Sequence, residues 1–298
     1  KKEDKPLLIL FQEVPGCMNC QRFGKQVMSN PLIVDVIENE FVPLCVFNNK
    51  KGKDAEVLAY FNEPSWNNPV VRIFDAEGEE LTPRMAKFHP KEIVQGIGEA
   101  LQSQQKDIPA YFKLLASHTQ AQYGQVEEAV FPMYCFWSGE LKLGQLEGVV
   151  NTVPGFMNGR EVVKVTYDGQ ATTYEKILQA AKERNAVDGA FVEGEKQRAS
   201  AEEILGRGAT RGLGQFSLDG EPKYYMSHTA YKYIPMLPTQ RIEVNRALYQ
   251  RRDPQRYLSP SQIALLDQIQ QKKGKWKDYS LSEDLVNDWE EAQVKITK

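Results

Sequence analysis

The chain has 298 residues, of which 41% are hydrophobic and 26% are charged, and its formal net charge is −3. This length is enough for two globular domains, each with its own core. The two signs of charge are interspersed, which argues against a nucleic-acid-binding protein, because such a protein needs a basic surface. No apolar run approaches the roughly 20 residues of a membrane-spanning helix. We therefore expect a globular protein with no nucleic-acid partner and no membrane-spanning segment in this chain.

The four cysteines are Cys17, Cys20, Cys45 and Cys135, and only the first two lie close together. This spacing does not fit a disulfide scaffold. The chain opens with the charged stretch KKEDKP directly before an apolar run, and it has no initiator methionine. Such a start is expected after removal of a signal peptide or a lipoprotein anchor, which favours a periplasmic or secreted protein.

The first part of the chain alternates short apolar runs with helical patterns. Strands are predicted at residues 7–12, 41–47 and 70–74, and helices at residues 31–38, 54–61 and 91–102. After the third strand a turn leads into a predicted hairpin partner. Alternating strands and helices that end in a hairpin predict an α/β domain with one antiparallel part.

The first candidate site is a CxxC motif, Gly16-Cys17-Met18-Asn19-Cys20, which follows the first predicted strand and enters a helix. The free N–H groups and the dipole of a helix N-terminus stabilise a thiolate, so these thiols can cycle between a dithiol and a disulfide. The alternative is half of a zinc site. That site needs two further ligands, and the remaining cysteines and histidines offer none at the usual spacing. We therefore expect a redox-active disulfide, no metal and no cofactor.

A CxxC after the first strand, with a proline before a later strand, resembles the thioredoxin family over about residues 1–104. The resemblance implies that Cys17 is the attacking thiol and Cys20 the resolving thiol. It also implies that Pro69 is a cis proline that lies against the disulfide and binds the extended partner. The loop departs from the family's Trp-Cys-Gly-Pro-Cys pattern, which leaves the redox potential open. Cys45 falls in a predicted core strand and is expected to be a buried structural thiol.

The rest of the chain divides into a linker, a second domain and a tail. Residues 105–125 begin with polar residues and continue as a connecting helix. A strand, a helix, two strands and a helix follow, and this order predicts a two-layer α+β sandwich over residues 126–238. Residues 239–298 have helical patterns and are predicted to form a helical C-terminal extension.

The second candidate site surrounds Cys135, in the sequence AVFPMYCFWSGELKLGQLEGVVNTVPGF. It resembles the A-class peptide methionine sulfoxide reductases, whose core motif is Gly-Cys-Phe-Trp-Gly-x-Glu. The matching positions are Cys135, Phe136, Trp137, Glu140, Leu146, Gly148, Val149, Thr152, Gly155 and Phe156. The match continues through Gly159-Arg160-Glu161-Val162-Val163, so the resemblance covers about residues 126–204.

This second resemblance implies reduction of methionine sulfoxide and repair of oxidised proteins. A thiolate attacks a sulfoxide sulfur while the oxygen is being protonated, so a nucleophile and a carboxylic acid must meet in one pocket. Cys135 is the candidate nucleophile, which ends as a sulfenic acid, and Glu161 is the candidate acid. Phe136 and Trp137 are the candidate apolar wall for the substrate methyl group.

Several features of the reductase family are missing. Tyr134 and Ser138 replace glycines of its motif. The loop between Phe156 and Glu161 is shorter than the family's and lacks its tyrosine. A later family segment that supplies an aspartate and a second tyrosine has no counterpart before Phe191. A non-catalytic remnant is therefore an open alternative.

Residues 223–233, KYYMSHTAYKY, offer replacements for the missing hydroxyl groups. We hypothesise that this segment folds over Cys135 and that Tyr225, His228 and Tyr231 bind the substrate. The alternative is that these rings only pack against the sandwich.

The two candidate sites suggest one reaction. Within these 298 residues no cysteine follows Cys135, so a sulfenic acid there needs a thiol from elsewhere. The CxxC domain is the nearest donor, at about millimolar effective concentration if the linker permits. The expected partners are an oxidised protein or peptide substrate and an external thiol reductant. Two alternatives remain: a protein disulfide oxidoreductase whose second domain binds the client, and a binding module in which neither thiol turns over.

Overall fold

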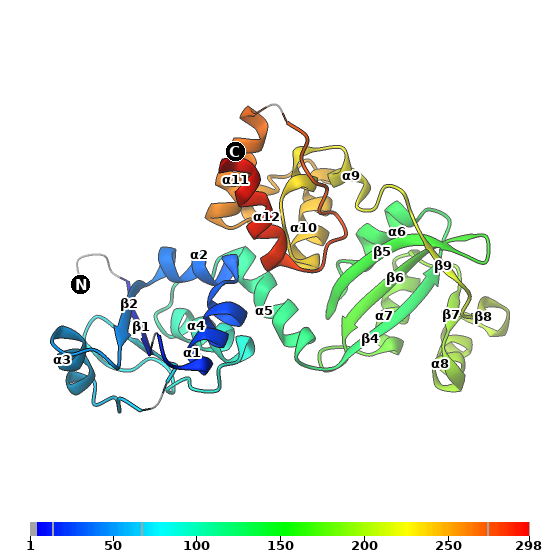
Figure 1. Cartoon of the computed structure of the whole chain (residues 1–298). Coiled ribbons are helices and arrows are strands. Elements are labelled where there is room, and N and C mark those ends of the chain that lie inside the picture. The colour runs from blue at the N-terminus through cyan, green and yellow to red at the C-terminus, as the bar shows by residue number, and fades with distance from the viewer. Residues whose placement is uncertain (1–4, 14, 67, 273, 298) are drawn as a thin grey trace. The chain divides into compact units, whose positions relative to one another are not determined.

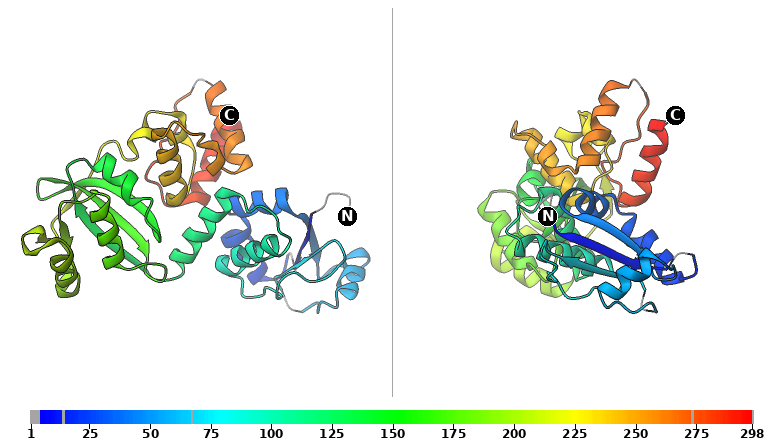
Figure 2. Two further views of the ribbon diagram at one scale, coloured as in Figure 1. Left: turned by 180° about the vertical axis from the view of Figure 1, so that it is seen from behind. Right: turned by 90° about the vertical axis from the view of Figure 1, so that its left-hand side faces the viewer.

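The computed structural model describes residues 5–13, 15–66, 68–272 and 274–297. The chain forms two compact units. Unit one comprises residues 1–119 and 259–261, and unit two comprises residues 120–258 and 262–298. The ribbon views show unit one in blue and cyan and unit two from green to red (Figures 1 and 2).

Unit one contains a three-stranded sheet in the order β2-β1-β3. Strand β1 (Leu7–Gln12) runs parallel to β2 (Val42–Phe47) and antiparallel to β3 (Val70–Phe74). Ile9 and Phe11 of β1 are fully buried and belong to a hydrophobic cluster shared with both neighbouring strands. The strands predicted at residues 7–12 and 70–74 have these same bounds in the structure.

Helices lie between and after the strands of this sheet. They are α1 (Met18–Phe23) with a π-helical continuation (Gly24–Met28), α2 (Pro31–Glu40), α3 (Lys53–Tyr60), α4 (Pro90–Ser103) and α5 (Ala110–Gln122). Asn30 begins α2 because its side chain accepts hydrogen bonds from the N–H groups of Leu32 and Ile33. The predicted hairpin after β3 is reduced to isolated bridges, one between Phe74 and Glu80 and one between Val71 and Met85.

The prediction that Cys45 is a buried structural thiol is wrong. Cys45 is exposed, and Val42 and Leu44 of the same strand are each 37% exposed. The reason is that β2 is an edge strand of the sheet, so its outer side has less cover than a central strand. An apolar, β-branched run alone does not distinguish the two positions.

Unit two contains a six-stranded sheet in the order β8-β7-β4-β6-β5-β9. Its long central strands are antiparallel neighbours: β4 (Val126–Pro132), β6 (Arg160–Asp168) and β5 (Val149–Met157). The short outer strands are β7 (Ala190–Val192), β8 (Thr210–Gly212) and β9 (Phe216–Leu218).

Three helices accompany this sheet, namely α6 (Phe136–Leu143), α7 (Tyr174–Glu183) and α8 (Gly194–Leu205). Leu143 of α6 and Leu178 of α7 share one buried cluster with Phe131, Val163 and Val165 of the sheet. Sheet and helices therefore form the two-layer α+β sandwich that the order of elements predicted.

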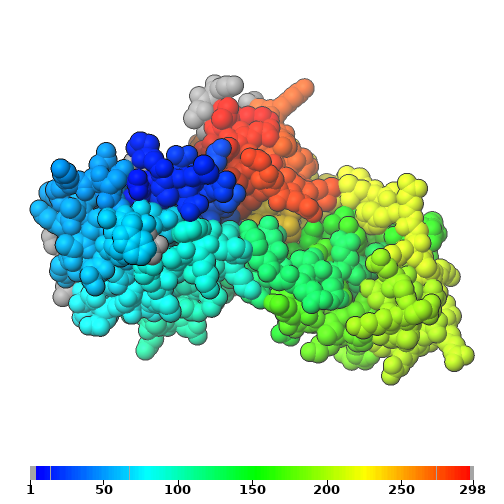
Figure 3. Space-filling model, turned by 60° about the horizontal axis from the view of Figure 1, so that its bottom comes forward, coloured from blue at the N-terminus to red at the C-terminus, as the bar shows by residue number. Residues whose placement is uncertain are grey.

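The C-terminal part of unit two is helical. It contains α9 (Tyr224–Ser227), α10 (Pro238–Tyr249), α11 (Pro260–Gln271) and α12 (Leu285–Thr297), with 3-10 turns between them. A separate hydrophobic cluster, which includes Met226, Ile234 and Leu266, joins these helices. The space-filling view shows the segment around β9 and α9 in yellow at the surface (Figure 3). Within the described part of the chain, no helix has both the length and the apolar character to cross a bilayer.

Candidate active sites

The CxxC cysteines lie at the start of α1. Cys17 is the N-cap residue, and its sulfur accepts a hydrogen bond from the N–H of Cys20 at 3.3 Å. Cys17 is half-buried, whereas Cys20 is only 2% exposed. Both thiols are free in this structure. A partner therefore reaches Cys17 first, while Cys20 lies behind it.

Burial raises the pKa of Cys20 to about 11. The hydrogen bond and the charge interaction with Cys17 act in the same direction. The N–H of Glu13 donates to the Cys20 sulfur at 3.3 Å and partly opposes this rise. Cys20 consequently keeps its proton at neutral pH and must lose it to attack a disulfide.

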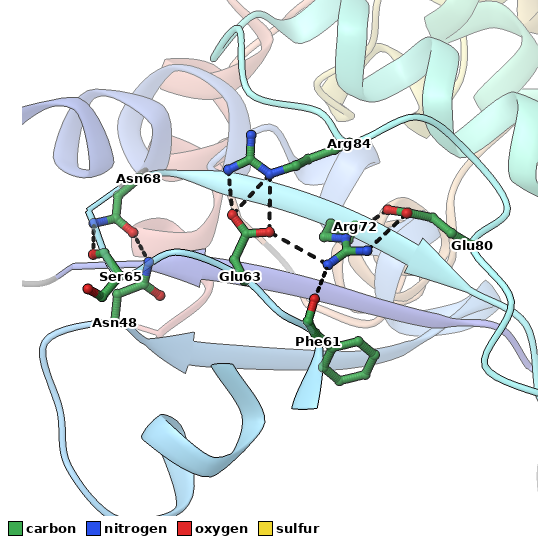
Figure 4. A network of polar contacts seen from close by, with 8 residues as sticks. All are labelled: Asn48, Phe61, Glu63, Ser65, Asn68, Arg72, Glu80 and Arg84. Carbon is green, nitrogen blue, oxygen red and sulfur yellow. Dashed lines mark hydrogen bonds and ion pairs between the residues drawn. The ribbon is translucent and has the colours of Figure 1, made fainter. Parts of the chain in front are cut away.

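The loop before β3 contains a cis peptide bond. The peptide bond between Asn68 and Pro69 is cis, and Pro69 itself is buried. Asn68 accepts a hydrogen bond from the Asn48 amide and donates to the Ser65 carbonyl at 3.3 Å (Figure 4). These contacts fix the position of the residue that precedes the proline.

Glu13 joins the two loops and was not singled out from the sequence. Its Oε2 accepts a 3.5 Å hydrogen bond from Asn68 Nδ2. Its Oε1 lies so close to Gly16 that a Cβ at that position would be 2.8 Å away, and Gly16 has a φ of +135°. A glycine in front of Cys17 is therefore required both by the backbone conformation and by the nearby carboxylate.

A buried ion-pair network supports the same loop. The Glu63 side chain is 1% exposed and binds the guanidinium groups of both Arg72 and Arg84 (Figure 4). Arg72 also donates to the Phe61 carbonyl at 2.7 Å and to the Glu80 carboxylate. The network ties the end of α3 to β3 and so holds the segment that carries Asn68 and Pro69.

In unit two, Cys135 and Glu161 meet at the start of α6. Cys135 is the N-cap residue and is partly exposed. Glu161 Oε2 accepts a 2.8 Å hydrogen bond from the N–H of Phe136, the residue directly after Cys135. The Glu161 carbonyl accepts a second bond, at 3.0 Å, from the N–H of Met133. The structure thus brings the predicted nucleophile and the predicted acid together, while their roles stay predictions.

An aromatic wall extends from Phe136 and Trp137. The Phe136 ring lies 5.7 Å from Trp137 and 5.3 Å from Phe156, centroid to centroid. Tyr224 stacks on Trp137 at 4.0 Å. Trp137 Nε1 donates to Asp219 Oδ2 at 3.3 Å, which fixes the orientation of the indole.

The segment at residues 223–233 reaches this wall only in part. Tyr225 is half-buried between Tyr224 and Tyr249, and burial raises its pKa, with further contributions from Tyr249 and Cys135. Its hydroxyl is therefore within electrostatic range of the candidate nucleophile. His228 lies one ring further away, 4.6 Å from Tyr224, and is largely exposed. Tyr231 lies elsewhere, against the C-terminal helical cluster, where it interacts with Gln255.

A buried ion pair holds this segment in place, and nothing in the sequence pattern indicated it. The Lys223 ammonium contacts the Glu140 carboxylate, the Thr152 carbonyl and, at 3.1 Å, the Thr152 hydroxyl. The Lys223 backbone has a left-handed φ of 54°. Burial lowers the pKa of Lys223, while Glu140 raises it. Since Tyr224 and Tyr225 follow directly, this ion pair anchors both rings.

Cys135 also opens onto a cavity of about 370 Å³. Its lining includes Tyr134, Ser138, Lys142 and Asp188. Tyr134 is 95% exposed, and the Asp188 side chain forms an ion pair with Arg160 at 2.5 Å. The sulfur is therefore accessible, and Asp188 is an acid near it that the sequence did not single out.

Comparison with known proteins assigns the two parts of the chain to different relatives. Residues 1–76 match a family model described as thioredoxin-like. The N-terminal domain is thioredoxin-like. A solved structure titled DsbH oxidoreductase is 21% identical and covers 34% of this chain and 75% of that chain, with a TM-score of 0.29.

The other relatives are peptide methionine sulfoxide reductases MsrA. The one from Methanococcus maripaludis is 37% identical over 70 residues, covering 18% of this chain and 45% of the relative. The one from Pelagibacter ubique is 36% identical over 70 residues, covering 18% of this chain and 48% of the relative. The one from Pseudomonas syringae is 35% identical over 71 residues, covering 18% and 33% respectively. The chain thus spans between a third and a half of the length of these relatives.

Proposed function

We propose that this protein is a thiol-dependent oxidoreductase that reduces methionine sulfoxide at Cys135. The observation that carries the proposal is the hydrogen bond from the Phe136 N–H to the Glu161 carboxylate, because it sets an acid beside a partly exposed thiol at a helix start. The similarity to reductases named MsrA supports the same substrate class.

The first step reduces the sulfoxide and oxidises the cysteine. The Cys135 thiolate, stabilised by the helix start, attacks the sulfoxide sulfur while Glu161 protonates the oxygen. The attack forms a bond between the two sulfur atoms. That bond and the sulfur–oxygen bond of the substrate then break as the hydroxyl moves to the Cys135 sulfur, which releases the thioether and leaves Cys135 as a sulfenic acid. Because Glu161 Oε2 accepts the Phe136 N–H, the proton is carried by Oε1 in this proposal.

The second step restores Cys135 with electrons from the CxxC. The Cys17 thiolate attacks the Cys135 sulfenic acid, which releases water and forms a Cys17–Cys135 disulfide. Cys20 then attacks the Cys17 sulfur, which frees the Cys135 thiolate and leaves a Cys17–Cys20 disulfide. An external thiol reductant returns that disulfide to the dithiol. The half-buried Cys17 and the buried Cys20 suit these two roles.

Turnover of a peptide containing methionine sulfoxide, with dithiothreitol as reductant, tests the first step. Activity in the wild type and its loss in Cys135→Ser are expected, and no activity in the wild type would overturn the proposal. Mass spectrometry of oxidised Cys20→Ser tests the relay. A Cys17–Cys135 adduct is expected there, and its absence would overturn the relay without touching the first step.

A second candidate function is protein disulfide exchange at the CxxC, with unit two binding the client. It is favoured by two large apolar side chains near Cys17 and Pro69, since Met18 is 64% exposed and Trp66 is 80% exposed. Exposed apolar groups of this kind suit a polypeptide partner. Reduction of insulin that survives in Cys135→Ser would support this function.

A further inference from the structure

A pocket of about 950 Å³ lies in unit two beside the residues that hold Trp137. Its lining comes from residues 218–222, 227–230, 232–233, 278 and 280–282. In the space-filling view, the yellow and the red segments that contribute to it lie next to each other (Figure 3). These residues are outside the part of the chain that resembles the reductase family, so the pocket is a feature of this chain.

The pocket adjoins the aromatic wall through two of its lining residues. Asp219 accepts the Trp137 hydrogen bond, and His228 packs against Tyr224, which stacks on Trp137. A group bound in the pocket is therefore next to the wall proposed for the oxidised side chain.

The size and the strand edge suit a polypeptide. Pockets for small ligands are about 300–1,000 Å³, so this one has room for much more than a single methionine side chain. Leu218, the last residue of β9, lines the pocket, and β9 is an outer strand of the six-stranded sheet. The free edge of such a strand pairs with extended peptides through main-chain hydrogen bonds.

One buried hydroxyl in the pocket has no partner. Ser280 lines the pocket and is 5% exposed, and its Oγ has no hydrogen bond to any described residue. Its backbone N–H is already bound to Asp278 Oδ1 at 2.8 Å. Buried polar groups are nearly always paired, so this hydroxyl can form a hydrogen bond with a polar group that reaches the pocket wall.

The charge of the lining indicates which polypeptides it accepts. Three carboxylates line the pocket, those of Asp219, Glu221 and Asp278, against the single ammonium of Lys232. His228 also lines the pocket, and its Nε2 lies 3.6 Å from Glu221 Oε1. The excess of negative charge favours a ligand that carries basic side chains.

We propose that this pocket binds the polypeptide around the oxidised methionine and prefers basic residues there. The proposal rests on the proposed function in placing the oxidised residue at Phe136 and Trp137. It extends that function by naming the substrate class: cationic segments of oxidised proteins.

Direct binding tests this without turnover. The full chain with Cys135→Ser is titrated into two labelled octapeptides, each with a central methionine sulfoxide flanked by two lysines or by two glutamates. Fluorescence anisotropy at low salt should show about tenfold tighter binding of the lysine peptide. The two lysines attract the pocket carboxylates, whereas the two glutamates repel them. The preference should shrink as salt is raised.

Variants with fewer charges test whether the preference for the lysine peptide arises in this pocket. Glu221→Gln with Asp278→Asn should reduce the preference to about twofold. The matched control is Glu195→Gln with Glu203→Gln, which removes the same charge from exposed positions on α8 and should keep the tenfold ratio. Ser280→Ala should weaken binding of the lysine peptide about threefold to tenfold without lowering the melting temperature, since the hydroxyl has no partner to lose.

Equal or undetectable binding of the two peptides overturns the proposal. It is also overturned if the pocket variant and the control variant have the same ratio of affinities for the lysine and the glutamate peptide. Wild-type turnover of both peptides separates the two proposals. Preferential binding without turnover refutes the proposed reductase function but supports the pocket. Turnover of both peptides at equal affinity supports the reductase function and refutes the pocket.

Discussion

Lys223 and Glu140 form an ion pair in which the two side chains are only 1% and 2% exposed. Glu140 lies on α6, whose N-cap residue is the catalytic candidate Cys135, and Lys223 directly precedes Tyr224, which stacks on Trp137. The pair therefore links the stability of unit two to the arrangement of the candidate site.

Removal of one partner of this pair should be costly. Lys223→Met leaves the Glu140 carboxylate buried without a cation and should lower the free energy of unfolding of unit two by about 3–5 kcal/mol. The double variant Lys223→Met with Glu140→Leu should recover most of that loss, because neither charge is then buried. Denaturant titration of the three proteins measures both effects.

The control for that experiment is Lys164→Met. Lys164 pairs with Glu128 at 3.3 Å on the surface, with the two side chains 33% and 55% exposed. Such a pair contributes at most about 1 kcal/mol. A loss in Lys223→Met no larger than in Lys164→Met contradicts the anchoring role.

Glu161→Gln tests the acid of the proposed reaction. The amide oxygen can still accept the hydrogen bond from the Phe136 N–H, so the N-terminus of α6 should be unchanged, but the amide has no acidic proton to transfer to the sulfoxide oxygen. Turnover of methionine sulfoxide should fall by about 100-fold to 10,000-fold. The melting temperature should change by only a few degrees, and a variant that keeps wild-type turnover excludes Glu161 as the acid.

Tyr225 is the candidate hydroxyl donor, and Tyr231 provides the matched control. Tyr225→Phe removes the hydroxyl that we propose as a donor to the substrate and should reduce turnover by about 100-fold, as expected for loss of a donor to the developing oxygen charge. Tyr231→Phe alters the C-terminal helical cluster and should leave turnover within about twofold. Equal effects of the two substitutions on turnover, measured as kcat/KM, argue against a role for Tyr225.

Local patterns in the sequence were sufficient to predict some of these features. The apolar strand and the helix start around Cys17 depend on neighbouring residues, and the family resemblance supplied Cys135 and Glu161. The strand pairing then places Glu161, because β6 lies between β4 and β5 and its Glu161 side chain bonds Phe136, the first residue of α6.

Other features depend on contacts that no local pattern encodes. Lys223 and Glu140 are 83 residues apart, and lysine is seldom buried, so nothing in the sequence near Lys223 indicates an interior position. Tyr225 and Tyr231 are in the same aromatic segment, yet Tyr225 packs against Tyr224 and Tyr249 while Tyr231 packs against the C-terminal helical cluster. The burial of Cys45 was predicted wrongly because edge strands and central strands have similar compositions.

Cys20 should resist alkylation until the pH approaches 11. Burial raises its pKa from 9.0 to about 11, and Cys17 adds to the rise. Since only the thiolate reacts, iodoacetamide at pH 8 should modify Cys17 and leave Cys20 almost unmodified, as read by peptide mass spectrometry. Modification of Cys20 should then increase about tenfold for each pH unit up to its pKa.

The same raised pKa defines a pH window for stability of the reduced protein. Below pH 9.0 the thiol is protonated in both the folded and the unfolded chain, so its contribution is fully present. Between pH 9.0 and about 11 the unfolded chain ionises first, and stability should fall by about 2–3 kcal/mol. Lysines and tyrosines titrate in this range too, so the quantity to measure is the difference in unfolding free energy between the wild type and Cys20→Ser. A difference that stays constant from pH 8.5 to 11 contradicts the buried, protonated state of Cys20, whereas a falling difference supports its role as the thiol that must be deprotonated to resolve the mixed disulfide.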